Sequence, residues 1–445
     1  MTCFHSPLSI GVGLLLTPLF SCANDTLNTM LQRQENKVTL SSSNWKLPRH
    51  TEKRVLDLSI QLKMESFSLR NKNLRRDEKR ENEMKWGPQV RLDSWIMKTS
   101  PVYGRVELEW QRRIKQKSGT PPEKTTHLEL NQAYIGLADT LIPHTRVQLG
   151  RWLYRDEREW LLDENLDGVA VRNRVGKWRI DTLGGKVNYW QRDLLDRTSR
   201  NEGTNNIAAL LVHRKQADDE MAGGYVITQS SPGNDIHRQN NLGLRSHSQN
   251  KRALQHWLEL GLADTYKPGG HYRGYALDIG GTYAFRDVSL KPRLTFGYAL
   301  GNQYYRQTGL HDNEATFGGK TKFKIYGETL NPDLSNLQIL TAGLGMHVTQ
   351  QATLDLVYHD YRQARLTELS QNRIDLKPKY DRQNTRRLGT GLDVILGWEP
   401  VDNAKLEARL GMFAPSKRFT SSAKRNNSPR SDTAYSAGIE MEIKF

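Results

Sequence analysis

The chain ends with the stretch YSAGIEMEIKF, residues Tyr435–Phe445, and the prediction of the fold class starts from this stretch. Apolar residues occupy every second position, and polar residues or glycine lie between them. Successive side chains of a strand point to opposite faces, so the stretch forms a strand with one apolar and one polar face. A soluble edge strand that ends on a bare aromatic residue risks aggregation, whereas a strand that closes a barrel in lipid places that residue at the membrane interface. Taken by itself, the stretch also fits a strand of a soluble β-sandwich.

The same alternation begins at Leu56. One face carries Leu56, Leu58, Ile60, Leu62 and Met64, and the other carries Asp57, Ser59, Gln61, Lys63 and Glu65. An α-helix would scatter these aliphatic residues around its axis. The apolar face is five residues tall, which is close to the lipid-facing band of a barrel strand. The segment therefore favours a membrane strand.

Further candidate strands follow along the chain. They are Gln89–Lys98, Val102–Lys115, Thr125–Ala138, His144–Arg155, Asp167–Arg174, Lys177–Trp190, Asn206–Lys215, Glu220–Gln229, Asn240–Arg245, Arg252–Leu262, Tyr272–Phe285, Val288–Leu300, Asn336–Gln350, Ala352–Tyr361, Leu388–Trp398 and Ala404–Phe413. With the first and last strands the total is about 18, an even number as bacterial barrels require.

The gaps between these strands carry independent information. The short gaps are Thr99–Pro101, Asp139–Pro143, Val175–Gly176, Arg286–Asp287, Gln351 and Glu399–Asn403, and the long polar gaps are Arg70–Trp86, Gln116–Lys124, Gln191–Asn205, Gly301–Ser335, Arg362–Arg387 and Ala414–Ser431. Long and short gaps largely alternate, as in an outer-membrane barrel with tight turns on one rim and long loops on the other. We therefore predict an all-β fold, a transmembrane antiparallel up-and-down β-barrel of about 18 strands.

The composition fits this fold class. Of the 445 residues 36% are hydrophobic, and the mean hydropathy is −0.71. No apolar run beyond the N-terminus approaches the roughly 18 residues of a transmembrane helix, but a barrel needs apolar residues only at alternate positions. The formal net charge of +16 favours anionic partners. Nucleic acid, lipid head groups and acidic polysaccharides all qualify.

The N-terminus has the pattern of an export signal. Ile10–Phe20 is apolar, and the small-residue sequence SCA that ends at Ala23 is a cleavage site. We predict a signal peptide over residues 1–23, and the alternative is lipid modification of Cys22. Cys3 and Cys22 are the only cysteines, so the mature chain forms no disulfide, which suits a bacterial envelope barrel.

The mature chain is predicted to contain one domain. Residues 24–52 are polar and aperiodic, and they are predicted to form a flexible periplasmic arm. Residues 53–445 are predicted to form the barrel.

One stretch combines charged and aromatic residues at high density. Residues 149–168 read LGRWLYRDEREWLLDENLDG, which begins on a strand and runs into a loop. Guanidinium groups held by neighbouring carboxylates present fixed donors to an anionic chain, so the stretch is typical of an inward-folded loop that narrows a channel. A solvated salt-bridge loop is the alternative.

The same stretch raises a glycosidase hypothesis. Its acid and base would come from Asp156, Glu159, Asp163 and Asp167. The hypothesis is disfavoured, because neighbouring arginines depress the pKa of a carboxyl group and a catalytic acid needs a raised pKa.

Three groups of residues match the motifs of a known family. They are Gly150-Arg151, Arg155-Asp156, Trp160, Asp163 and Leu166-Asp167-Gly168 behind LNQAYI at residues 130–135; Leu388-Gly389 with Gly391–Ile395; and Gly411–Pro415. Together they resemble the alginate export porin family, from Val90 to Phe445. The resemblance implies an outer-membrane barrel with this number of strands. It also implies a narrow, arginine-rich constriction through which a polyanionic uronate polysaccharide diffuses.

The resemblance assigns residues to the constriction. Arg151, Arg155 and Arg158 are the candidate arginines, with Asp156, Glu157 and Asp163 as their carboxylate partners. Asp393 matches an acidic position on a late strand and is expected to brace an arginine. Alternation against Val106 and Leu92 adds Arg105 and Arg91 as lumen-facing candidates. The segments 24–52 and Gly301–Ser335 have no counterpart in the family that we can assign.

These expectations define the partners. We expect an anionic polysaccharide, outer-membrane lipid and periplasmic secretion-complex proteins as partners, a monomer, no nucleic acid and no cofactor. The histidines lack ligand spacing, so no metal site is expected. The expected function is a channel and not an enzyme. The alternatives are a substrate-specific, anion-selective porin for nutrient uptake and an envelope glycosidase or lyase.

Overall fold

The computed structural model describes residues 56–74, 80–95, 101–139, 142–187, 189, 192–196, 205–217, 220–230, 238–248, 253–367, 374, 376, 385–416 and 432–445. The predicted signal peptide, residues 1–23, and the predicted arm, residues 24–52, lie outside these residues. No helix in the described part of the chain has the length and apolarity needed to cross a bilayer.

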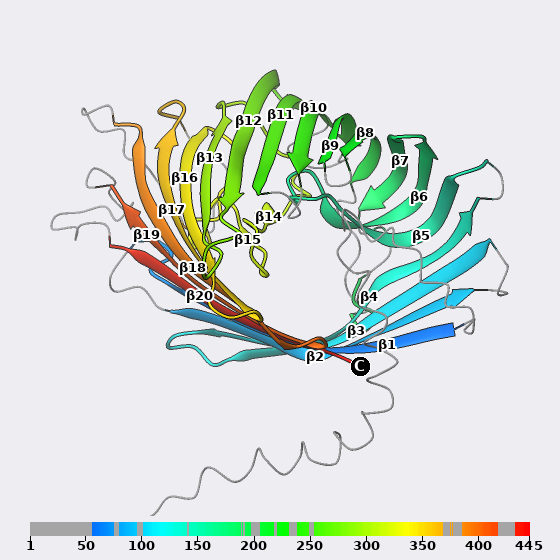
Figure 1. Cartoon of the computed structure of the whole chain (residues 1–445), viewed down its shortest axis with the longest axis horizontal. Coiled ribbons are helices and arrows are strands. Elements are labelled where there is room, and N and C mark those ends of the chain that lie inside the picture. Colours follow the sequence, from blue (N-terminus) through cyan, green and yellow to red (C-terminus); the bar gives the residue numbers. More distant parts are fainter. Residues whose placement is uncertain are drawn as a thin grey trace, which may run out of the picture. The chain divides into compact units, whose positions relative to one another are not determined.

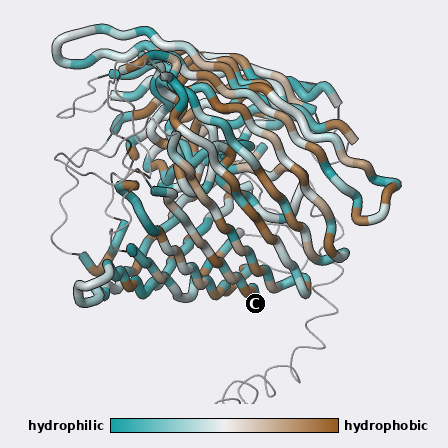
Figure 2. Tube along the Cα trace, turned by 90° about the vertical axis from the view of Figure 1, so that its left-hand side faces the viewer, coloured by the Kyte–Doolittle hydropathy of each residue, from teal (hydrophilic) through white to brown (hydrophobic). Residues whose placement is uncertain are grey.

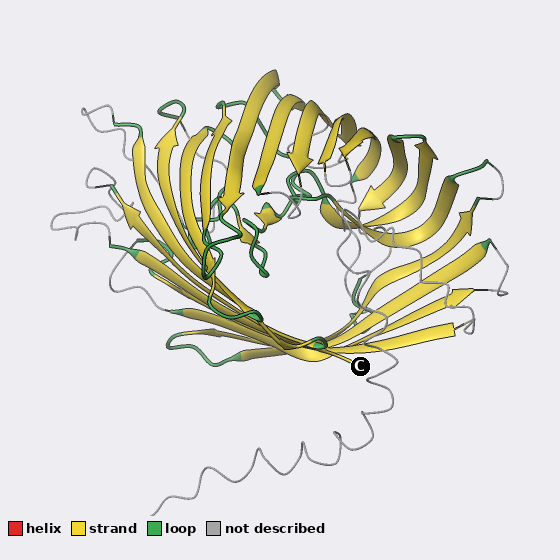
Figure 3. Ribbon diagram, viewed as in Figure 1, coloured by secondary structure: helices red, strands yellow, loops and turns green. Residues whose placement is uncertain are grey.

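The long strands follow one another around a single sheet. They are β1 (Leu56–Arg70), β2 (Glu81–Trp95), β3 (Val102–Lys117), β4 (Glu123–Ala138), β5 (Thr145–Arg155), β6 (Asp163–Val175), β7 (Trp178–Val187), β8 (Asn206–Ala217), β9 (Glu220–Ser230), β10 (Arg238–Ser248), β11 (Leu254–Lys267), β12 (Gly270–Ala284), β13 (Arg293–Gly301), β16 (Leu337–His347), β17 (Ala352–Gln363), β18 (Arg387–Val401), β19 (Ala404–Pro415) and β20 (Ala434–Lys444). Each pairs antiparallel with the next, and β1 also pairs with β20, which closes the 18-stranded sheet into a barrel (Figures 1 and 3). The predicted up-and-down barrel is confirmed.

The first and last strands meet in a register that keeps the apolar residues together. Met64 lies opposite Met441, and Leu62 lies opposite Ile443. The outer faces of both strands expose apolar side chains, and hydrophobic and hydrophilic residues alternate along the barrel strands (Figure 2). An exposed apolar band of this extent is a liability in water and is the lipid-facing surface of an outer-membrane barrel.

The two rims carry different connections. Tight turns such as Gly176–Lys177 and Asp402–Asn403 lie on one rim, together with the start of β1 and the end of β20. We call this the short-turn rim. The opposite rim, the long-loop rim, carries most of the longer connections, although β11 and β12 are joined there by the tight turn 268–269. The predicted asymmetry between the rims is therefore present.

The segment between β13 and β16 differs from the prediction. The sequence placed Gly301–Ser335 among the rim loops, but residues 302–336 fold into the lumen (Figure 1). We call them the lumenal loop. It contains a small separate hairpin of β14 (Glu314–Ala315) and β15 (Phe323–Lys324). The prediction was wrong because strand periodicity does not detect an irregular segment that is buried by its own apolar side chains.

Buried apolar side chains hold the lumenal loop inside the barrel. They include Tyr305, Leu310, Phe317, Phe323, Ile325, Tyr326, Leu330 and Leu334. Gly274 on β12 permits close approach, because a Cβ atom there would lie 2.1 Å from the backbone nitrogen of Tyr305. At the other end of the loop, Lys320 Nζ lies 2.6 Å from Glu399 Oε2 near the end of β18. The loop thus spans the lumen from the long-loop rim to the short-turn rim.

Candidate channel constriction

The connection between β5 and β6, residues 156–162, also folds into the lumen, and we call it the inner turn. The Asp156 carboxylate shapes it by accepting a hydrogen bond from the backbone N–H of Leu162 at 2.7 Å. Trp160 is fully buried, and its indole nitrogen donates to the Tyr326 hydroxyl of the lumenal loop at 2.8 Å. The predicted inward fold of this stretch is therefore present, and the two inward segments are joined to each other.

A buried ion-pair network fixes the inner turn to the barrel wall. Arg245 of β10 is fully buried and donates to Asp156 at 2.8 Å and to Glu259 of β11 at 2.5 Å. Its guanidinium also lies 3.6 Å from Glu157. Burial would raise the pKa of the Glu157 carboxyl, but His247, Arg245 and Arg179 outweigh it and hold that pKa well below its ordinary value. Asp156 and Glu157 therefore attach the inner turn to Arg245 of the wall.

Arg158 also points into the wall. Its guanidinium lies 3.1 Å from Asp278 of β12 and 4.4 Å from the ring centre of Trp257. Asp278 additionally accepts hydrogen bonds from the Trp257 indole and the Tyr326 hydroxyl. Because a buried arginine is stable only when paired and hydrogen-bonded, Arg158 positions the constriction and does not line it.

Arg151 and Arg105 pair with carboxylates across neighbouring strands. Arg151 donates to both oxygens of Asp167 at 2.7 and 2.8 Å, and Arg105 donates to Asp93 at 2.6 and 3.1 Å. Each pair sits on directly opposed positions, β5 with β6 and β3 with β2. Both arginines are buried, so these bidentate pairs brace the wall. Arg91 lies 3.7 Å from Asp93 and is more exposed.

Arg155 is the predicted arginine that lines the open recess of the lumen. Its side chain is 39% exposed, and it donates to both oxygens of Asp163 at 2.6 and 3.0 Å. Glu159 of the inner turn lies 3.3 Å away. The sequence did not predict its neighbour Lys322 on the lumenal loop, which is 38% exposed and lies 2.5 Å from Glu159.

Glu159 departs from the pKa that the sequence analysis expected. Burial raises the pKa of Glu159 to about 7, despite the opposing field of Lys322. The argument that arginines depress every carboxyl pKa in this stretch was therefore wrong for Glu159. The same burial leaves the side chain 1% exposed, so a sugar does not reach it as a glycosidase would require.

Carboxylates gather where the two inward segments meet. Ligand atoms of Glu159, Asp312 and Glu314 lie within 4.8 Å of one another. Lys322 contacts Glu159 at 2.5 Å, and Lys324 contacts Glu314 at 3.0 Å and also Asp312. Because lysine ammonium groups already neutralise these anions, we assign no metal to the cluster.

The open part of the lumen beside these residues is a polar recess of about 370 Å³. It lies mainly against β1 to β4. Its charged lining consists of five basic residues, Lys63, Lys85, Arg113, Arg155 and Arg192, and six acidic residues, Glu65, Glu107, Glu109, Glu129, Asp163 and Glu164. The lining is therefore mixed in charge and not purely arginine-rich.

Asp393 has partners other than an arginine among the described residues. Its carboxylate accepts a hydrogen bond from the backbone N–H of Glu328 at 3.1 Å and lies 3.4 Å from His359 Nε2. It therefore anchors the lumenal loop to β18, away from Arg155. The expected brace on an arginine is replaced by a brace on the loop backbone.

Comparison with known proteins gives the family. The model of the alginate export family matches residues 54–431. The chain belongs to the alginate export family. A curated relative, the alginate production protein AlgE of Azotobacter vinelandii, is 27% identical over 195 residues, which cover 37% of this chain and 39% of that protein. The resemblance drawn from the motifs is confirmed, and this alginate export family member is an integral β-barrel of the outer membrane.

Solved structures support the fold of this family member. The outer membrane protein OprD of Pseudomonas aeruginosa has a TM-score of 0.52 and 9% identity, covering 88% of this chain and 93% of that chain. OccAB1 of Acinetobacter baumannii has a TM-score of 0.58 and 9% identity, covering 88% and 96%. At these identities the likeness shows the barrel fold only.

Proposed function

We propose that the protein is an outer-membrane channel that exports an anionic exopolysaccharide, an alginate-like uronate polymer, by passive diffusion. The family match supports this class of polymer. The observation that carries the proposal is the narrowing of the lumen by the inner turn and the lumenal loop, which leaves Arg155 (39% exposed) and Lys322 (38% exposed) beside the open recess.

The proposed mechanism is electrostatic. Arg155 and Lys322 lower the energy of polymer carboxylates inside a low-dielectric wall, where charges interact more strongly than in water. Asp163 and the glutamates of the recess keep any single site from binding the chain too tightly, since conduction requires release as well as entry. Arg151, Arg158, Arg105, Asp156 and Glu157 hold the wall and the inner turn in shape.

The remaining partners follow from this proposal. The barrel works as a monomer, outer-membrane lipid surrounds it, and periplasmic secretion-complex proteins deliver the polymer to the short-turn rim. Nucleic acid, metal and cofactor take no part, and the passage of the polymer involves no chemical step.

The test is single-channel selectivity. In the double variant Arg155→Gln with Lys322→Gln, we expect the anion-to-cation permeability ratio to fall, because two exposed cations of the constriction are lost. Arg273→Gln is the matched control, since its side chain is 81% exposed at the β11–β12 turn and outside the lumen. Unchanged selectivity in the double variant, or an equal loss in the control, contradicts the proposal.

A second measurement separates export of a polymer from uptake of a small anion. Purified uronate oligomers should interrupt the wild-type current, and the double variant should show shorter interruptions. A porin for small anionic nutrients would instead conduct small carboxylates without any block by uronate oligomers.

A further inference from the structure

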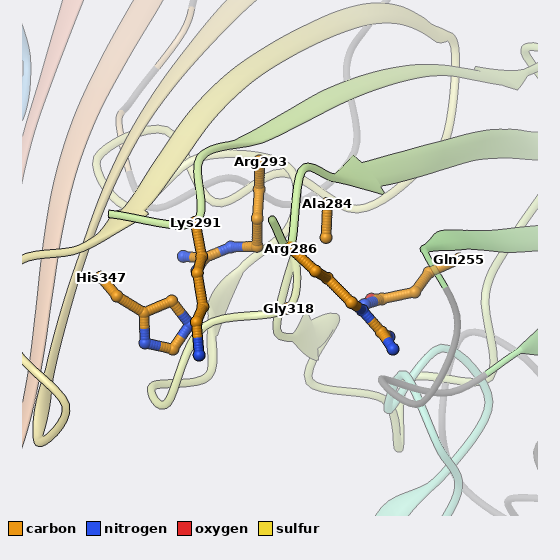
Figure 4. Close-up of a pocket in the computed structure, with 7 residues that line it drawn as sticks. All are labelled: Gln255, Ala284, Arg286, Lys291, Arg293, Gly318 and His347. Carbon is orange, nitrogen blue, oxygen red and sulfur yellow. The ribbon is translucent and has the colours of Figure 1, made fainter. Parts of the chain in front are cut away.

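A second pocket, with basic residues in its lining, lies at the short-turn rim of the lumen. Figure 4 shows the residues that line it. Its volume is about 200 Å³, and it is lined by Gln255, Ala284, Arg286, Lys291, Arg293, Gly318 and His347. These residues come from β11, β12, β13, β16, the turn between β12 and β13, and the tip of the lumenal loop. No carboxylate belongs to the lining, which is unlike the mixed recess.

Arg293 lines this pocket and has an unused hydrogen-bond donor. Its Nε donates to the backbone oxygen of Phe317 at 3.2 Å, and one terminal nitrogen donates to Asp355 at 2.8 Å. The other terminal nitrogen has no hydrogen-bond partner. The side chain is only 3% exposed, so bulk water does not supply one. A buried guanidinium donor without a partner is costly, and an anion in the pocket would satisfy it.

The turn between β12 and β13 holds a second cation over the pocket. Leu290 and Lys291 have φ angles of 62° and 41°, a region that residues with a Cβ atom avoid unless the surrounding structure holds them there. The backbone N–H of His347 stabilises this conformation by donating a hydrogen bond to the Leu290 oxygen at 2.8 Å. No carboxylate of the described residues forms an ion pair with Lys291 within 4.0 Å.

Two cations of the pocket lie close enough to His347 to act on it. Lys291 and Arg293 interact electrostatically with His347, and the Lys291 amine lies beside its imidazole in Figure 4. Like charges concentrated in a concave, low-dielectric pocket repel each other and attract a counter-ion. The volume is below the roughly 300–1,000 Å³ of a site for a drug-sized ligand, so the pocket suits a single carboxylated group.

We propose that this pocket is an entry subsite that binds one carboxylate of the polysaccharide before the chain reaches the constriction. The inference rests on the proposed export function. Arg293 and Lys291 donate charge-assisted hydrogen bonds to the carboxylate oxygens, and Arg286 and His347 complete the basic lining of the pocket. The lumenal loop connects the two sites, because Gly318 lines this pocket and Lys322, four positions later, pairs with Glu159 beside Arg155.

The test is block of the single-channel current by trimannuronate added to one side of the bilayer at a time. In Lys291→Glu we expect block from the short-turn side to weaken about tenfold, as the loss of a charge-assisted hydrogen bond implies. Block from the long-loop side should change little. Arg286→Gln is a second variant of the same pocket, and heat-modified gel migration checks that each barrel is folded.

The control is Lys215→Glu, which makes the same charge change on the same rim, near the end of β8 and outside the pocket. If trimannuronate blocks this control as strongly as the wild-type protein and blocks the pocket variants less strongly, the subsite is supported. Equal weakening in the control and in Lys291→Glu overturns it, because general rim charge would explain both. If trimannuronate blocks every pocket variant as strongly as the wild-type protein, the subsite is overturned and the export proposal stands. If trimannuronate does not block the wild-type protein from either side, the export proposal itself is overturned.

Discussion

The two sides of the barrel lumen follow the same alternating pattern but differ in what covers their inward-facing side chains. On the side of β1 to β4, Glu65 and Lys85 face the open recess and are 43% and 29% exposed. On the side of β10 to β12, Arg245 and Glu259 are covered by the inner turn and the lumenal loop and are 0% and 1% exposed. The width of the passage is therefore set by segments inside the barrel and not by the number of strands.

This difference changes what an ion pair does. Exposed pairs on the β1–β4 side contribute about 0–1 kcal/mol each, because water and salt screen them. Pairs on the covered side have lost their water, so removing one partner leaves an uncompensated charge in a low dielectric. The exposed pairs are adaptable and suit a moving polymer, and the buried pairs are a rigid support.

Removing the lumenal loop should have the largest effect on the channel. When residues 305–334 are replaced by a Gly-Ser-Gly linker, we expect single-channel conductance to rise severalfold, because the lumenal loop no longer fills its side of the lumen. The barrel should still close, since the backbone N–H of Asn336 donates to the Asn302 oxygen at 3.0 Å and the ends of the deletion lie together.

In the matched variant on the open side, the same linker replaces residues 118–122 between β3 and β4. The conductance of this variant should stay close to the wild-type value. Equal conductance in both replacements would show that the lumenal loop does not limit the passage.

The next effect tests the ion pairs of the two sides. Arg245→Gln leaves the carboxylates of Asp156 and Glu259 buried without their cation, and breaking such a pair costs about 3–5 kcal/mol. We expect a lower unfolding temperature by circular dichroism and a noisier open channel as the inner turn loosens. Arg113 lines the recess, is 27% exposed and pairs with Glu83, so Arg113→Gln should cost at most about 1 kcal/mol. Equal losses would end the distinction between the two walls.

The smallest effect concerns the boundary between the two sides, at Glu159. Its pKa is raised by burial from an ordinary value of 4.5 to about 7, so the folded protein binds this proton more tightly than the unfolded chain does. The stability that this proton contributes is full below a pH of about 4.5 and is lost as the pH rises through about 7. Lowering the pH from about 8 to about 5 therefore removes one negative charge beside Arg155, and anion selectivity should increase modestly.

Reversal potentials at the two pH values measure this change. Glu159→Gln should abolish the pH-dependent step, and Glu123→Gln, at an exposed position on the outer end of β4, should retain it. A step of the same size in both variants would assign the titration to another group.

Part of the site followed from local sequence. Arg155 and Asp163 lie on facing positions of the β5–β6 hairpin, and the same register opposes Arg151 and Asp167. The hairpin register therefore contained these partners, although the predicted set named Asp156 and Glu157 and omitted Asp167 as a partner. The pair of Arg158 with Asp278 had no such signal, because 120 residues separate them.

The barrel, its number of strands and the asymmetry of its rims could be predicted from local sequence. This was possible because strand alternation and gap length are local properties that repeat along the chain. Which arginines reach the passage depends on long-range packing. Arg158 is buried against Asp278, 120 residues away, and Glu159 beside Arg155 meets Lys322 across 163 residues. The burial that separates a bracing arginine from an exposed one arises when the lumenal loop packs against the finished wall.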